Sequence, residues 1–404
     1  MHLFNGNGES VFPLISSDNN VPSFDSTYGI SEKENFKNRK KIPDESIIVT
    51  GIKNCIGNIK RSKDRHDFIV LTPASPSDLK EIDHEFEPKQ QATRLFQDAI
   101  QAFDSRKFES ASQFYKKAAN FGNLQALHNL GLMLLYGQGI PQNTTEAHQN
   151  FIVCSSRGLA ASMSQLGYMH LYGFGATQDL RRARSWFIRS VEAGNDGYAN
   201  YCLAVIYLRG YGVPANTDIG KKYLLQSVAV NFVPALYNLA VCYSTGKYDF
   251  APNIELAVKL YKVLALRHDD PLAQNNLGVI YATGSEGGIS RNPKRAAILF
   301  KLAAKKSISE ASFNLGVAYS DGIGVSRNTF KAIRHYYEAS DKAKNCDAEY
   351  NLGYLFLTGG GGSEEIKSDL EQSLYWFQRA AQNGRIAARN NLMVLMKAMT
   401  RRSI

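Results

Sequence analysis

The 404-residue sequence has little cysteine, only two tryptophans and no long apolar run. Its five cysteines, Cys55, Cys154, Cys202, Cys242 and Cys346, are an odd number without a CxxC motif or a Cys/His cluster. This pattern predicts reduced thiols, as in the cytoplasm or nucleus, and no zinc site. The longest apolar runs fall far short of the ~20 residues that cross a bilayer, so we expect no transmembrane segment.

The first residues, MHLFNGNGESVF, also lack the features of a targeting signal. They have no basic stretch followed by an apolar one, as a secretory signal has, and no arginine-rich amphipathic start, as a mitochondrial presequence has. We therefore expect a cytoplasmic protein, with the nucleus or the face of a membrane as alternative locations.

The positive charge of the chain is concentrated after its first 90 residues. Residues 1–90 carry 12 Lys/Arg and 14 Asp/Glu, a net charge of −2, whereas residues 91–404 carry 35 and 23, a net charge of +12. A basic surface favours an acidic partner. Nucleic acid is disfavoured as that partner, because the later residues contain no dense Arg/Lys run with interleaved aromatic residues.

Residues 1–88 are rich in Asn, Ser, Asp and Lys and show no sustained apolar period, which predicts a disordered regulatory arm. Thr72 and Ser75 each precede a proline and are candidate phosphorylation sites for proline-directed kinases. Phosphate there would add negative charge beside a basic domain and could dock or release the arm. Lys33-Glu34-Asn35 matches a degron tripeptide, a match short enough to arise by chance.

Helical periodicity starts at Gln90. Apolar residues at helical spacing on both sides of a short polar break, 104–107, predict a helical hairpin over residues 90–122, similar to a tetratricopeptide unit. A repeat follows, marked by leucines 36 to 40 residues apart, and a period in this range indicates a solenoid of helix pairs. The leucines are Leu130, Leu166, Leu203, Leu239, Leu277, Leu315, Leu352 and Leu392.

The segment SFNLGVAYSDGIGV, residues 312–325, shows the parts of one repeat. A small residue lies four positions before the leucine, and Gly316 follows it, where we expect two helices to approach closely. Gly322, seven residues after the leucine, is where the first helix must end, because glycine accepts the left-handed conformation of a helix C-terminus. A second helix carries a small residue four before a large one, such as Ala332 and Tyr336, on one core-facing side.

This pattern resembles the Sel1-like repeat family, and the resemblance covers about residues 126–401. It implies an all-α, right-handed superhelical solenoid of antiparallel helix pairs. We place about seven full repeats and a C-terminal capping helix in residues 123–404. The family supplies scaffolds in signalling, membrane-protein degradation and cell-wall assembly, and the layout of a disordered arm before the repeats is similar to that of fungal chitin synthase regulatory factors.

An asparagine precedes the leucine in six repeats, and we call this set the asparagine ladder. Each amide offers a donor and an acceptor, so amides spaced by one repeat along a concave groove can bind the backbone of an extended peptide. The alternative is a structural role, in which each asparagine bonds to a neighbouring helix. The ladder consists of Asn129, Asn238, Asn276, Asn314, Asn351 and Asn391.

No residue pattern indicates catalysis. His170, His268 and His335 are single and scattered, which argues against a metal site. No nucleophile–base set is present, and the run Gly359–Gly362 lacks the Lys-Ser/Thr ending of a phosphate-binding loop. We expect no cofactor and no enzymatic activity. The predicted function is an adaptor that binds a partner protein or an extended, acidic peptide segment in a basic groove. The alternative is a regulatory subunit of a membrane enzyme such as chitin synthase.

Overall fold

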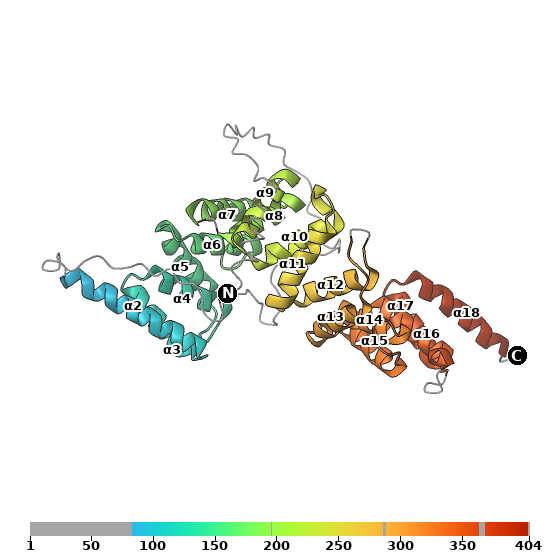
Figure 1. The fold of residues 1–404 in the computed structure, drawn as a ribbon. Coiled ribbons are helices and arrows are strands. Elements are labelled where there is room, and N and C mark those ends of the chain that lie inside the picture. Colours follow the sequence, from blue (N-terminus) through green and yellow to red (C-terminus); the bar gives the residue numbers. More distant parts are fainter. Residues whose placement is uncertain (1–82, 195, 286–287, 363–367, 403–404) are drawn as a thin grey trace. The chain divides into compact units, whose positions relative to one another are not determined.

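The computed structural model describes residues 83–194, 196–285, 288–362 and 368–402. Within these ranges the chain forms seventeen α-helices, α2 to α18, one short 3-10 helix and no strand, which confirms the all-α prediction (Figure 1). None of the helices in these ranges combines the length and apolarity needed to cross a bilayer. The predicted arm, with Thr72 and Ser75, lies almost entirely outside the described residues.

The helices alternate between a first and a second helix of each repeat, and most such pairs pack directly on each other. The first helices are α4 (Leu124–Tyr136), α6 (Ala160–Tyr172), α8 (Gly197–Arg209), α10 (Val233–Thr245), α12 (Pro271–Thr283), α14 (Ser309–Asp321) and α16 (Cys346–Gly362). The second helices are α5 (Thr144–Ser156), α7 (Leu180–Gly194), α9 (Thr217–Ala229), α11 (Ile254–Arg267), α13 (Pro293–Lys305), α15 (Thr329–Ala343) and α17 (Leu370–Gln382), and α18 (Ile386–Arg402) follows.

Before these repeats, α2 (Asp83–Asp104) and α3 (Phe108–Asn120) form a hairpin, joined by a ring contact of 5.2 Å between Phe103 and Phe108. The hairpin was expected over residues 90–122, and α2 begins seven residues earlier, at Asp83. The chain as a whole divides within α10 into two compact units, residues 1–238 and 239–404, each with its own buried apolar cluster.

The predicted close approach of paired helices is confirmed at the glycine after the leucine. A β-carbon on Gly316 would lie only 2.7 Å from the ring of Tyr336, so the ring occupies the space that any larger residue would need. The same arrangement recurs in another repeat, where a β-carbon on Gly167 would lie 2.6 Å from the ring of Phe187. The small residues four positions before the leucines are fully buried: Ala126, Ser162, Ala199, Ala235, Ala273, Ala311, Ala348 and Ala388.

The turn between the two helices of a repeat is built as predicted, with an additional feature. Gly322 takes φ of +72°, as expected for the glycine that ends a first helix. The residue that caps the next helix, Asn328, then donates its backbone N–H to the Tyr319 carbonyl at 2.9 Å, and its side chain accepts the N–H of Lys331. The same side-chain cap recurs at Asn143, Asn216, Asn253, Asn292 and Asp369.

Candidate partner-binding site

The asparagine ladder lies on the first helices and on α18, and its members differ in exposure. Asn129, Asn276, Asn314, Asn351 and Asn391 are partly exposed. Asn238 is 0% exposed, so its amide does not reach the surface. The ladder positions that could meet a partner are therefore the five partly exposed ones, of which three lie on consecutive first helices, α12, α14 and α16.

Most ladder amides also bond to a tyrosine that precedes them in the chain. Asn276 donates to the Tyr261 hydroxyl at 3.3 Å, which joins a first helix to the second helix before it. Asn391 donates to Tyr350 at 3.1 Å, and so joins α18 to the preceding first helix. The pairs Asn129–Tyr115 and Asn351–Tyr336 are hydrogen-bonded in the same way as Asn276 and Tyr261. The ladder thus has a structural role between helices. An amide side chain has two donor hydrogens and an acceptor oxygen, which is more than one such bond uses.

The Tyr336 and Tyr261 hydroxyls of these pairs are neutral at physiological pH. The pKa of Tyr336 is raised to about 12, chiefly by burial and also by the nearby Asp321 carboxylate, and the hydrogen bonds to Asn351 and Ser320 oppose this shift. Burial likewise raises the pKa of Tyr261. Both hydroxyls are therefore hydrogen-bonding groups, and proton transfer at neutral pH is not their chemistry.

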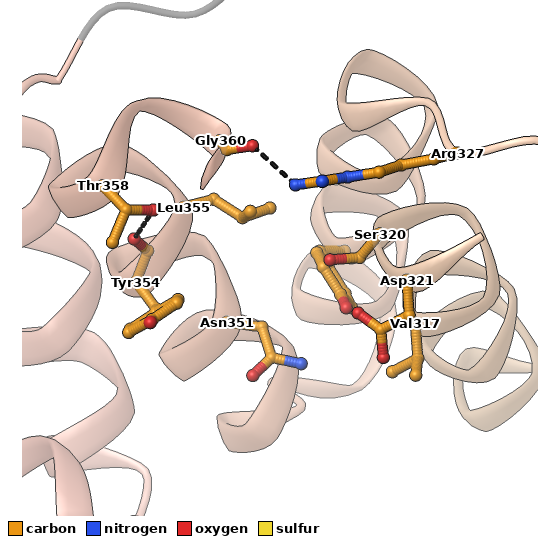
Figure 2. A pocket seen from close by; sticks show the side chains of 10 residues that line it. Val317, Ser320, Asp321, Arg327, Asn351, Tyr354, Leu355, Thr358 and Gly360 are labelled. Carbon is orange, nitrogen blue, oxygen red and sulfur yellow. Dashed lines mark hydrogen bonds between the residues drawn. The ribbon is translucent and has the colours of Figure 1, made fainter. Parts of the chain in front are cut away.

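A pocket of about 510 Å³ opens beside one member of the ladder, in the unit of residues 239–404 (Figure 2). Figure 2 shows Asn351 extending from α16 toward α14, opposite Val317 and Asp321. The lining comes from α14, the loop after it, α15 and α16: Val317, Ser320, Asp321, Arg327, Tyr336, Asn351, Tyr354, Leu355, Thr358 and Gly360.

Arg327 departs from a contact that other repeats share. The residue just before the cap of the second helix usually bonds back to its own first helix: Gln142 to the Leu135 carbonyl at 2.8 Å, and Gln178 to Leu171 at 2.9 Å. Arg291 does the same with Ala282. Arg327 instead extends across the pocket and donates to the Gly360 carbonyl of the next repeat at 2.9 Å (Figure 2).

The pocket therefore combines charged, amide, aromatic and apolar groups. Asp321 and Arg327 are exposed and of opposite charge, Asn351 supplies an amide, and the ring of Tyr354 is 53% exposed. Val317 and Leu355 add apolar surface. A few polar groups on an apolar wall are typical of ligand pockets, where the polar groups fix the orientation of the ligand.

The other candidates occupy structural positions. His170 packs edge-on against His148 with ring centroids 5.7 Å apart, and His335 stacks on Tyr319 at 5.7 Å. Among the residues that the structure describes, no three His, Cys, Asp or Glu side chains converge as a metal ion would require. Cys154, Cys202, Cys242 and Cys346 are free thiols.

Comparison with known proteins identifies the repeat. A family model described as Sel1 repeat matches seven segments: residues 124–152, 160–195, 197–229, 233–268, 271–307, 309–343 and 346–384. The segments coincide with the pairs of first and second helices described above, from α4/α5 to α16/α17.

Curated relatives are named as regulators and as a ligase component. Chitin synthase regulatory factor 4 of Schizosaccharomyces pombe is 25% identical over 346 residues, 83% of this chain and 48% of that protein. Chitin synthase regulatory factor 3 of the same yeast is 27% identical over 189 residues, 46% of this chain and 20% of that protein. HRD3B of Arabidopsis thaliana, an ERAD-associated E3 ubiquitin-protein ligase component, is 30% identical over 97 residues, 24% and 15% of the two chains. The chain spans less than half the length of each of these relatives.

Two solved structures share the fold. A protective antigen of uropathogenic Escherichia coli, described as having an SLR fold, superposes with a TM-score of 0.63 at 23% identity, over 78% of this chain and 66% of that one. A Sel1 repeat protein from Oxalobacter formigenes gives a TM-score of 0.52 at 20% identity, over 81% and 97%. At these identities the likeness establishes the helix-pair solenoid alone.

Proposed function

Because this chain belongs to the Sel1 repeat family, we propose that it is a non-catalytic adaptor that holds an extended segment of a partner protein along the first helices of its repeats. The observation that carries the proposal is the pocket beside Asn351. It lies one repeat after Asn314 and two after Asn276, so the side chain of a bound peptide would enter the pocket while its backbone met the partly exposed amides.

The charge of the chain indicates the kind of segment. Residues 91–404 carry a net charge of +12, which favours an acidic partner and speeds its association. Arg327, exposed at the rim of the pocket, would meet an acidic side chain, and Asp321 on the other side would accept backbone or side-chain donors. No residue is assigned a catalytic or cofactor-binding role in this proposal, and nucleic acid is not the partner it invokes.

The test compares two changes that both remove the bonds of Asn276 to Tyr261 and of Asn351 to Tyr336, and the asparagine variant also removes the bond of Asn314 to Asn275. One variant carries Asn276→Ala, Asn314→Ala and Asn351→Ala, which remove the proposed peptide contacts. The matched control, Tyr261→Phe with Tyr336→Phe, removes the hydroxyls that bond to Asn276 and Asn351 but leaves the amides in place. Partners are purified with the full chain and identified by mass spectrometry, and circular dichroism verifies that both variants stay helical.

An adaptor that uses the ladder loses its partner in the asparagine variant and retains it in the tyrosine control. Equal retention in both variants would contradict the proposal and leave the asparagines with their structural role alone. Equal loss in both would attribute the effect to the broken helix–helix bonds, and would equally count against direct contact by the amides.

A second candidate function is favoured by the names of the relatives. The two chitin synthase regulatory factors described above align with this chain, and the alignment with factor 4 covers 83% of this chain. The adaptor would then be a cytoplasmic regulatory subunit or activator that acts at the membrane face on an enzyme such as chitin synthase. This role is supported if the protein co-fractionates with membranes only in cells that contain the synthase. An unchanged distribution in cells without the synthase rules it out.

A further inference from the structure

The solvent face of α13 has an unusual composition. Lys294, Ile298, Lys301, Leu302 and Lys305 fall within about a third of the helix circumference, given 100° per residue, and all five are exposed. Ile298 is 60% and Leu302 is 41% exposed, and no acidic residue interrupts the set. We call this set the basic–apolar face. Ile298 and Leu302 are not part of the core. The core-facing side of α13 is the opposite one, where Ala296, Phe300 and Ala303 are buried.

Two other second helices of the same unit carry related faces. On α11, Lys259 and Lys262 are exposed together with Leu266, which is 75% exposed. On α15, Phe330 is 56% and Tyr337 is 39% exposed. Helix α12 packs against both α11 and α13, and α14 packs against both α13 and α15. Exposed large apolar side chains therefore recur on three successive second helices, and on α11 and α13 exposed lysines accompany them.

We propose that the basic–apolar face docks on an anionic phospholipid surface. Lysines near an anionic membrane are attracted to its surface, and apolar side chains exposed beside them can enter the interface. The lysines would pair with phosphate and carboxylate headgroups, while Ile298 and Leu302 enter the boundary between headgroups and acyl chains. Helix α13 contains no acidic residue, so none of its own side chains would be repelled by an anionic membrane surface.

The basic–apolar face is separate from the pocket, because no residue of α13 lines the pocket. Helix α15 carries both a pocket residue and exposed apolar side chains, on different sides. Tyr336 of α15 is 2% exposed and lines the pocket, whereas its neighbour Tyr337 is exposed to solvent. A membrane on the second helices would therefore leave the ladder accessible for a protein. The proposal does not depend on the adaptor function, because vesicles test it without any partner protein.

The experiment measures co-sedimentation of the full chain with vesicles. One set contains only phosphatidylcholine, and the other contains 30% phosphatidylserine by mole, as a chosen test composition. We expect binding to the anionic vesicles alone, weakening as salt increases. The variant Lys294→Gln/Lys301→Gln/Lys305→Gln should lose about 100-fold in partitioning, because each lysine near an anionic surface contributes about a factor of five.

Two further variants complete the test. One asks whether the apolar side chains insert into the membrane, and the other asks whether the net charge of the chain alone explains binding. Ile298→Ser with Leu302→Ser should weaken binding while preserving the salt dependence. The control Lys116→Gln/Lys117→Gln/Lys222→Gln removes three exposed lysines from α3 and α9 of the other unit and should bind as the unchanged chain does. Absence of binding to anionic vesicles, or an equal loss in both lysine variants, would overturn the proposal. Capture by immobilised poly-glutamate without vesicle binding would also overturn it, in favour of an acidic protein.

Discussion

The Asn238 amide donates a hydrogen bond of 2.8 Å to the hydroxyl of Tyr201, and both side chains are 0% exposed. This bond joins the first helices of two consecutive repeats, α8 and α10. It shows what a ladder asparagine does when no surface is available to it: it satisfies a polar group inside the helix stack. The partly exposed members make similar bonds at the edge of the stack, where a ligand could also reach them.

We predict that Asn238→Ala destabilises the protein by about 1–3 kcal/mol, because it removes a buried hydrogen bond and leaves a buried hydroxyl with one partner fewer. The measurement is urea unfolding of the single variants Asn238→Ala and Tyr201→Phe and of the double variant. The double variant should cost less than the sum of the two single ones. Strict additivity would show that the two groups do not interact in solution.

The repeat assignment predicts a larger effect at a leucine of the core. Leu277 is 2% exposed, so Leu277→Ala should cost about 2–5 kcal/mol through lost contacts and the resulting cavity. Val279 lies two residues further on α12 and is 39% exposed, so Val279→Ala should cost less than about 0.5 kcal/mol. Thermal unfolding followed by circular dichroism compares them, and indistinguishable midpoints would argue against the repeat register.

Histidine burial predicts how stability depends on pH. Burial lowers the pKa of His128 to about 4, below its usual 6.5, and the Nδ1 atom of His128 lies 2.8 Å from the Ser162 hydroxyl. The unfolded state therefore binds more protons between pH 6.5 and pH 4, so stability is lost as the pH falls through this window. The loss should approach about 1 kcal/mol per pH unit.

His128→Asn should reduce this slope, because asparagine does not titrate. The alternative outcome is that His128→Asn loses stability with falling pH as steeply as the unchanged chain does. Melting temperatures between pH 7 and pH 5 decide between these outcomes. A slope that His128→Asn leaves intact would assign the acid sensitivity to other groups.

The position of Arg327 predicts a larger effect on binding than on stability. Arg327→Ala removes a guanidinium from the rim of the pocket together with its hydrogen bond to the Gly360 carbonyl, so the free energy of unfolding should fall by about 0.5–1.5 kcal/mol. Partner affinity should fall at least tenfold, given the 1.5–3 kcal/mol typical of a hydrogen bond to a charged group. Arg291→Ala, at the equivalent position of the preceding repeat, should bind normally. Normal binding by both variants would show that Arg327 does not contact the partner.

Local patterns were sufficient to predict most of the fold. Leu277, Gly316 and Gly322 each have a role set by sequence spacing, and the structure places them where that spacing required. The start of α2 at Asp83 was missed because a proline, Pro88, lies inside that helix, and proline usually marks a helix boundary.

The candidate site was less predictable, because its contacts join residues far apart in the sequence. The bond between Arg327 and Gly360 spans 33 residues, and no local pattern distinguishes Arg327 from Arg291. The tyrosine partners of the ladder could have been found, since Tyr261 and Tyr336 both lie 15 residues before their asparagines. Asn238 instead uses Tyr201, 37 residues away, and its complete burial depends on the packing of the whole stack.

The most direct test of partner binding along the first helices is site-specific photo-crosslinking in the full chain. A photoreactive phenylalanine analogue replaces Tyr354, which is 53% exposed at the pocket, or Tyr337, which is 39% exposed on the outer side of α15. The adaptor account predicts a crosslink to the partner protein from position 354, lost when Asn276, Asn314 and Asn351 are changed to alanine, and none from position 337. A partner crosslinked from position 337 alone would contradict the account and place the protein interface on the second helices.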